Sequence, residues 1–344
     1  MPTDDRSVHS DDRFDELATR LGGFYLSWVV YLGLELGLFA RIRAAGKAGI
    51  APATLASETG CAAGPVEAWV RGAHSSELVG FDGTVVTLPD DTASVLLDDT
   101  RPEYLGGQFV AAVVSSLDYA SLADFFRSGR PIPERPPRFH RAIEAVTVQD
   151  IAVFFQEGLA QLPDLAASLA AGGRVLDVAC GGGKWLIAVA LRFPATSLVG
   201  VEFEPDSVAR AMRHVTDARL ESRIRIEARD TVAMPFDGEF DLVYLQDALH
   251  ELADPPASLR SAWKAVRPGG RLVVLDWCLP SSLEESQSLQ AELLWGVQID
   301  ELFQGTQMYT REGFLGIFVA AGVARPTIIE LVSGATLFVV ERPA

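Results

Sequence analysis

The sequence predicts an α/β fold in which a mostly parallel β-sheet, covered by helices, follows a smaller and mainly helical domain. From residue 173 onward, short apolar runs alternate with amphipathic stretches of about ten residues, the pattern of a parallel sheet with helices on both faces. The last two apolar runs are joined by only VSG, so the final strand should pair antiparallel to its neighbour. Before residue 128 the pattern indicates helices and one short hairpin.

The expected first domain, residues 1–127, begins with a helix over residues 24–42 that is apolar nearly all round. Such a helix should be buried, within the domain or against a second subunit. Two further helices are expected over residues 52–60 and 64–79, and two short β runs flank Asp82-Gly83, a strong hairpin signal. Two helices and a hairpin form the outline of a winged helix.

The charge of this region argues against the DNA binding that winged helices often perform. Arg71 is the one Lys or Arg between residues 51 and 90, and the whole chain has a formal charge of −17 and a pI near 4.7. Nucleic acid and anionic membranes are therefore not expected as partners, because both require neutralising positive charge. A dimerising domain is the preferred interpretation, and a transcription regulator is a less favoured hypothesis.

Cysteine usage and hydropathy predict a cytoplasmic protein. The cysteines at positions 61, 180 and 278 are widely spaced and form no CxxC pair, so neither a disulfide framework nor a zinc site is expected. The N-terminus is acidic, unlike a signal peptide, and the apolar stretch 24–34 is well short of the ~20 residues of a membrane span. The proline-rich residues 128–138 predict a linker, continued by a helical bridge to residue 172.

The expected second domain, residues 173–344, provides seven strands in a Rossmann-like order. Strands are expected at 174–180, 197–203, 223–230, 240–249, 271–277, 326–331 and 335–343. Helices are expected at 184–193, 206–215, 256–266, 293–305 and 311–322.

The glycine-rich stretch RVLDVACGGGKW, residues 174–185, follows the first of these strands. A phosphate-binding P-loop would need glycine at Val178 and Ser or Thr at Trp185. A dinucleotide fingerprint counted from Gly181 would need glycine at Leu186. A third template has a strand ending in Asp, a glycine loop, a helix and an acid closing the next strand, and it is matched by Asp177, Gly181, Gly183 and Glu202.

With these residues the second half resembles the class I S-adenosylmethionine-dependent methyltransferases. More narrowly, the whole chain is similar to the two-domain small-molecule methyltransferases of the O-methyltransferase type, which carry a winged-helix-like dimerisation domain in front. The family's first loop glycine is Ala179 here, which would still permit close backbone approach if its φ stays negative.

The resemblance implies S-adenosyl-L-methionine as cofactor and S-adenosyl-L-homocysteine as product. Asp177 would orient the glycine loop or meet the methionine ammonium through water, Glu202 would accept the ribose hydroxyls, and Asp230 would take the adenine amine. The other expected cofactor contacts are Ala179, Gly181, Gly183, Phe203, Thr231 and Gln246.

For catalysis, His250 falls where the O-methyltransferase members place their general base, and Glu251 follows it as the family's acid does. Asp276 aligns with the first of two carboxylates that steer this base, whereas the second position holds Met308. No metal site is expected, since His250 alone among the histidines sits at the catalytic edge. A carboxylate-only metal site around Asp247, Asp276 and Glu301 stays open.

The acceptor pocket is expected at Phe154, Phe155, Trp295 and Gln298, with Tyr25 and Trp28 reaching in from the first domain or a partner subunit. These residues favour an aromatic or apolar small molecule. The expected reaction is methyl transfer to a hydroxyl oxygen, with His250 as candidate general base, in a homodimer formed through the N-terminal helices. The alternatives are C- or N-methylation by positioning, and a cyclase or decarboxylase that uses the fold without methylating.

Overall fold

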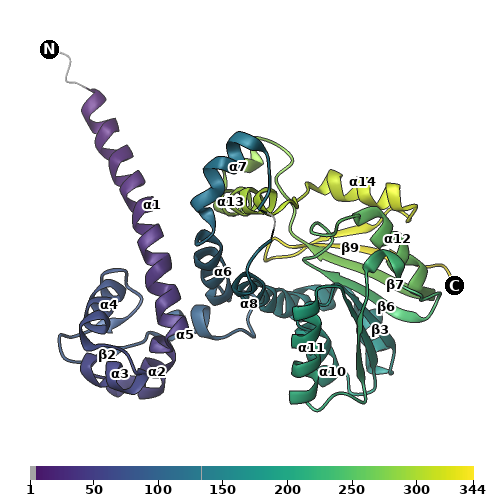
Figure 1. The fold of residues 1–344 in the computed structure, drawn as a ribbon, viewed down its shortest axis with the longest axis horizontal. Helices are drawn as coiled ribbons and strands as arrows, with labels where there is room; N and C mark the ends of the chain where they lie inside the picture. The colour runs from purple at the N-terminus through teal and green to yellow at the C-terminus, as the bar shows by residue number, and fades with distance from the viewer. Residues whose placement is uncertain (1–4, 133) are drawn as a thin grey trace. The chain divides into compact units, whose positions relative to one another are not determined.

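The computed structural model describes residues 5–132 and 134–344, so parts of the predicted polar N-terminus and proline-rich linker lie outside the described residues. The chain forms two compact units that divide between Leu117 and Asp118 (Figure 1). Residues 118–172, which include the predicted linker and bridge, belong to the second unit. None of the described helices is by itself long and apolar enough to cross a lipid bilayer.

The first unit is a set of helices around one small hairpin. Its elements are α1 (Asp5–Glu35), α2 (Leu38–Ala45), η1 (Gly46–Ala48), α3 (Pro52–Thr59), α4 (Ala63–Ser75), β1 (Gly80–Phe81), β2 (Val86–Thr87), α5 (Asp90–Leu97) and α6 (Gly106–Ser116). The predicted hairpin is confirmed: β1 and β2 pair antiparallel, and the Asp82 carboxylate accepts from the backbone N–H groups of Thr84 and Val85. Phe39 and Trp69 pack edge to face in the core of this unit.

The prediction of one continuous helix over residues 24–42 is wrong. The helix breaks between Glu35 and Leu38, where Gly37 adopts a left-handed φ of 67°. Hydrophobic periodicity does not mark such a break, because apolar residues continue on both sides of it. Phe24 and Tyr25 are 54% and 63% exposed in the single chain, so this part of α1 is not covered by its own unit.

The second unit begins with helices that lead into the sheet. These are η2 (Tyr119–Ser121), α7 (Leu122–Ser128), α8 (Pro137–Val153), η3 (Phe154–Gly158, a π-helical turn), η4 (Leu159–Gln161) and α9 (Pro163–Ala170). The bridge helix therefore starts at the end of the proline-rich stretch. Pro137 is its first residue, a position where proline's missing N–H leaves no helical hydrogen bond unmade.

The seven-stranded sheet that the sequence predicts is confirmed. Its strands are β3 (Arg174–Val178), β4 (Ser197–Glu202), β5 (Ile224–Ala228), β6 (Phe240–Gln246), β7 (Val266–Asp276), β8 (Thr327–Glu330) and β9 (Thr336–Glu341), in the spatial order β5-β4-β3-β6-β7-β9-β8. β9 runs antiparallel to both of its neighbours, β7 and β8, and the other pairs of the sheet are parallel. Strand order reverses at β3, between β4 and β6, and in such sheets ligands bind at the carboxyl ends beside this reversal.

Helices cover both faces of the sheet (Figure 1). Alternate residues of β6 divide between two cores: Leu242 and Tyr244 face one, and Val243 and Leu245 face the other. The first core contains side chains of α10 (Lys184–Arg192) and α11 (Pro205–Asp217), and the second those of α12 (Pro255–Ala265) and α14 (Arg311–Ala321). The remaining helices are α13 (Leu289–Gln304) and the short η5 (Thr231–Ala233) and η6 (Glu285–Gln287).

Candidate active site

The glycine loop between β3 and α10 turns sharply through left-handed residues. Gly181 and Gly183 have φ of 51° and 71°, and Ala179 has φ of 60°. The expectation that φ of Ala179 stays negative is therefore wrong. The turn needs a left-handed residue at this point, and alanine adopts it at a cost of roughly 1–2 kcal/mol because its Cβ crowds the following carbonyl.

Glu202 ties the glycine loop to the end of β4. Its Oε2 accepts from the N–H of Gly181 at 2.9 Å, and its Oε1 accepts from the N–H groups of Phe203 and Glu204, both at 2.8 Å. A Cβ added to Gly181 would meet no other atom within 4 Å, so the loop has open space on that side. The carboxylate thus fixes the loop while space for a ligand is left in front of it.

A second set of contacts holds the middle of the loop. The side chain of Glu144, on α8, lies so close to Gly182 that a Cβ there would meet its Oε1 at 1.7 Å. Glu144 pairs with Arg210 at 3.2 Å, and the Gly182 carbonyl lies 2.8 Å from Nδ1 of His214. These residues are not predicted from the sequence, because nothing local marks a contact between α8, α11 and the loop.

The other predicted cofactor contacts lie in different surroundings. Asp177 is buried, and burial together with the charge of Glu202 raises its pKa well above the ordinary value. Asp230 follows β5, is exposed, and accepts from the N–H of Val232. Phe203 is exposed. Thr231 is buried, and its hydroxyl lies 2.7 Å from that of Ser258. Gln246 donates a hydrogen bond to the Thr147 carbonyl at 3.0 Å.

His250 lies buried in the turn after β6, where it is held by a carboxylate. Its Nδ1 is 2.9 Å from Oδ1 of Asp276, the last residue of β7, and 4.0 Å from Oδ1 of Asp247. Burial lowers the pKa of His250, but the charge and hydrogen bond of Asp276 outweigh it and raise this pKa well above its ordinary value. The imidazole therefore keeps its proton to higher pH than a free histidine.

The residue at the position of the family's second steering carboxylate contributes no carboxylate to this site. Met308 is buried and apolar there, and its N–H donates to the side chain of Gln298 at 2.7 Å. Glu301, one turn further along α13 from Gln298, instead brings a carboxylate to within 4.8 Å of ligand atoms of His250 and Glu251. The sequence left Glu301 open as part of a carboxylate-only site with Asp247 and Asp276, and it did not indicate that Glu301 lies beside His250 and Glu251.

Five carboxylates surround His250, and we call them the acid cluster: Asp150, Asp247, Glu251, Asp276 and Glu301. Burial is the main cause that raises the pKa of Asp247 to about 7, and the charges of Asp276 and Glu301 add to it. Burial and the charge of Glu301 raise the pKa of Glu251 to about 8. Two triads of this cluster could hold a metal ion by their spacing: Asp247, His250 and Asp276, and His250, Glu251 and Glu301.

A cavity of about 470 Å³ opens onto His250 and Glu251. Its walls include Phe125, Pro131, Leu252, Leu302 and Tyr309. The predicted acceptor-pocket residues are elsewhere. Phe154 is fully buried and packs against the rings of Phe155, Trp185 and Tyr244. On α13, Trp295 is exposed, whereas Gln298 is buried and accepts from the N–H of Met308. Tyr25 and Trp28 lie on α1 of the first unit.

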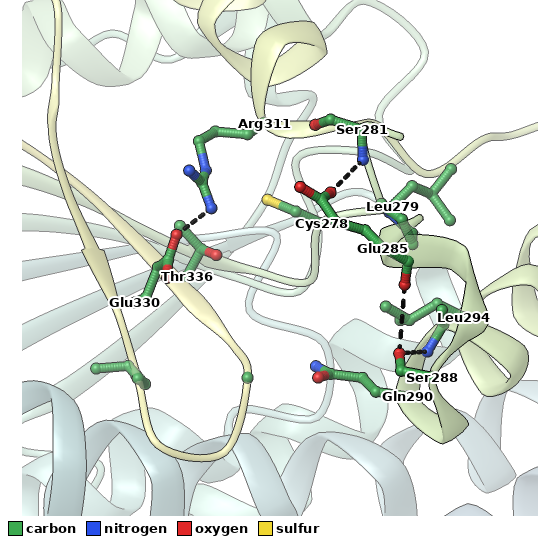
Figure 2. A pocket seen from close by; sticks show the side chains of 14 residues that line it. Cys278, Leu279, Ser281, Glu285, Ser288, Gln290, Leu294, Arg311, Glu330 and Thr336 are labelled. Carbon is green, nitrogen blue, oxygen red and sulfur yellow. Dashed lines mark hydrogen bonds and ion pairs between the residues drawn. The ribbon is translucent and has the colours of Figure 1, made fainter. Parts of the chain in front are cut away.

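A smaller cavity of about 240 Å³ lies beside the end of β7, and Figure 2 shows its lining. Its polar groups largely satisfy one another: Arg311 pairs with Glu330, and the Ser281 N–H donates to Glu285. Burial raises the pKa of Cys278 to about 12, so its thiol is not an activated nucleophile.

Comparison with known proteins identifies the region that carries this site. Residues 169–314 match the family described as a methyltransferase domain. The 27-O-demethylrifamycin SV methyltransferase of Amycolatopsis mediterranei is 30% identical over 173 residues, covering 48% of this chain and 63% of the relative. A demethylmenaquinone methyltransferase of Thermus thermophilus is 38% identical over 108 residues, 31% of this chain and 48% of the relative. The chain spans less than two thirds of the length of these curated relatives.

Solved structures resemble the chain along nearly its whole length. PigF bound to S-adenosylhomocysteine has a TM-score of 0.73 and 19% identity over 95% of this chain and 98% of that one. Human N-acetylserotonin methyltransferase bound to S-adenosylmethionine has a TM-score of 0.72 and 18% identity over 100% of both chains. At this level of identity the likeness shows the fold, and it includes the N-terminal helical region.

Proposed function

We propose that this chain, whose residues 169–314 match the methyltransferase domain family, transfers a methyl group from S-adenosylmethionine to a small-molecule acceptor. The observation that carries the proposal is the contact of Glu202 with the N–H of Gly181. Through this contact the carboxylate at the end of β4 lies beside the glycine loop, which is uncharged and has open space at Gly181. The loop follows β3, the strand at which the strand order of the sheet reverses. The methyltransferase relatives and the cofactor-bound neighbours support the same ligand.

The residues at the loop fit this cofactor, which supplies a methyl group on a sulfonium when bound. Glu202 uses three of about four acceptor positions of a carboxylate on backbone N–H groups, so it can still accept from a ribose hydroxyl. Asp230 is exposed at the end of β5 and can accept from an adenine amine. An ammonium near Asp177 would stabilise the ionised form of that buried carboxyl.

For a hydroxyl acceptor, His250 would remove the proton as the methyl group is transferred in line. Donation of Nδ1–H to Asp276 orients the ring and leaves Nε2 to receive that proton. Asp276 and Glu301 act here as positioning residues. The acceptor would occupy the cavity that opens onto His250 and Glu251.

A second candidate is transfer to carbon or nitrogen by positioning alone. It is favoured by the raised pKa of His250, because an imidazole that holds its own proton more firmly is a less available proton acceptor. Replacement His250→Ala separates the two mechanisms once an acceptor is in hand. Base-assisted transfer should fall by about 10²-fold or more, whereas transfer by positioning should be largely kept.

We also infer a homodimer formed through α1. Phe14, Leu17, Leu21, Phe24 and Tyr25 recur every one to four residues along this helix and are 49–71% exposed in the single chain. An apolar stripe of this kind is typical of a helix that packs against a second helix. Light scattering should give twice the chain mass, and Leu21→Glu should give the monomer with cofactor binding unchanged.

Titration calorimetry with S-adenosylhomocysteine tests the function. The wild-type protein should bind it with a micromolar Kd. Glu202→Gln should weaken binding roughly tenfold or more, since a charged acceptor becomes a neutral one. Glu221→Gln, an exposed glutamate just before β5, is the matched control and should bind like the wild type. Absence of binding to the folded wild-type protein would contradict the proposal.

A further inference from the structure

The acid cluster around His250 brings together more carboxyl groups than the chain pairs with cations. None of its five carboxylates forms an ion pair with a lysine or arginine anywhere in the described part of the chain. The cationic side chain that lies beside Asp247, Asp276 and Glu251 is His250. A bound cofactor would add one sulfonium, and a further cation beside Glu251 would stabilise the ionised form of this carboxyl, whose pKa is raised by burial and by the charge of Glu301. Such a site is complementary to a further cation.

Two buried oxygens of the cluster have no hydrogen-bond partner. Asp276 is 0% exposed and uses Oδ1 for His250 and for the N–H of Trp277, while its Oδ2 has no partner among the described residues. Asp150 is 2% exposed, and its Oδ2 is likewise unpartnered, although Oδ1 accepts from the Trp277 indole at 3.1 Å. Buried carboxylate oxygens are rarely left in this state, so a donor from outside the chain is expected here.

The cavity meets the acid cluster at His250 and Glu251, and its lining indicates the chemical class of a molecule that binds beside the cluster. Its volume of about 470 Å³ far exceeds what a single ion needs, and most of its walls are apolar or aromatic, including Phe125, Leu302 and Tyr309. No lysine or arginine lines it, and its acidic end is formed by Glu251 next to His250. A molecule with an apolar body and one cationic end fits both the walls and the charge.

We propose that the acceptor carries a protonated amine, which pairs with Glu251 at the end of the cavity while the apolar part of the acceptor lies against Phe125, Leu302 and Tyr309. This inference rests on the proposed function and adds the substrate class of the same site. The amine is a recognition group in this account. It gives Glu251 a cationic partner, which favours the ionised form of this carboxyl, and it sets the orientation in which the methyl-accepting atom faces His250.

Three probes of matched size test the inference on protein saturated with S-adenosylhomocysteine, with EDTA present. They are 2-phenylethylamine, 2-phenylethanol and 3-phenylpropionate, which present a cation, a neutral hydroxyl and an anion on the same aromatic body. The amine should bind at least about tenfold more tightly than the alcohol, and the carboxylate should bind most weakly. Glu251→Gln should reduce the advantage of the amine to about threefold or less.

Two further variants show whether the preference for the amine depends on the acid cluster. Glu285→Gln, in the smaller cavity, should leave the preference unchanged. Glu301→Gln, in the acid cluster, should weaken it as Glu251→Gln does. Each variant should retain its affinity for S-adenosylhomocysteine, which confirms that it is folded. If the wild type binds S-adenosylhomocysteine but shows no preference for the amine, or binds none of the probes, the inference fails and the proposed function stands.

A divalent metal ion is the rival source of positive charge. Without EDTA, Mn²⁺ can be titrated and followed by electron paramagnetic resonance. The amine assignment predicts weak or absent binding of Mn²⁺, at a Kd above about 1 mM. Binding of Mn²⁺ with a micromolar Kd that Glu251→Gln abolishes would overturn the amine assignment.

Discussion

Replacement of Ala179 by glycine should stabilise the protein, against the usual effect of such a change. Ala179 has a φ of 60°, where a residue with a Cβ is strained by roughly 1–2 kcal/mol and glycine is not. Glycine also gains conformational freedom in the unfolded chain, which costs about 0.4–1 kcal/mol. The difference predicts a net gain of about 0.5–1 kcal/mol in the free energy of unfolding.

Urea unfolding followed by circular dichroism measures this effect. Ala218→Gly is the matched control, because Ala218 closes α11 with φ of −77° and is not strained. It should lower the free energy of unfolding by about 0.5–1 kcal/mol. Gly181→Ala should also destabilise, since it places a Cβ on a residue with φ of 51°. If Ala179→Gly destabilises the protein as much as Ala218→Gly, the reasoning about the glycine loop is refuted.

The contacts of the site lead to three more predictions. Asp276→Asn should lower the pKa of His250, because the charge and hydrogen bond that raise it are weakened; an NMR titration of the imidazole that shows no decrease would contradict this. Gly182→Ala should weaken binding of S-adenosylhomocysteine at least tenfold, since its Cβ would meet the Glu144 carboxylate, and adding Glu144→Ala should restore part of the affinity. The free energy of unfolding should fall as pH rises from about 5 to 8, because the Glu251 carboxyl, with a pKa raised to about 8, holds a proton in the folded protein that the unfolded chain has released. Glu251→Gln should make this fall with pH shallower.

The sheet was predictable because most of its strands can be identified from their own residues alone. β3, β4, β6 and the second half of β7 are runs of mostly apolar, buried residues, and the short segment between β8 and β9 indicates their antiparallel pairing. The break in the first helix was not predictable from the same signal. Gly37 interrupts the backbone but not the apolar pattern, so periodicity alone favours one helix.

The site was predictable where its residues end strands and not where they come from distant helices. Glu202 and Asp276 terminate β4 and β7, and topology brings such positions to one edge of a sheet. Glu144 reaches the site from α8, and no spacing in the sequence specifies that contact. Phe154 shows a further limit: an aromatic residue near a site has the same sequence signal whether it lines a pocket or fills the core.

A crystal structure of the protein with S-adenosylhomocysteine bound tests the central claim most directly. We expect the nucleoside in front of the glycine loop, with a ribose hydroxyl within hydrogen-bond distance of Glu202 and the adenine amine facing Asp230. Density for the nucleoside away from the loop, or a Glu202 carboxylate with no contact to the sugar, would contradict that claim.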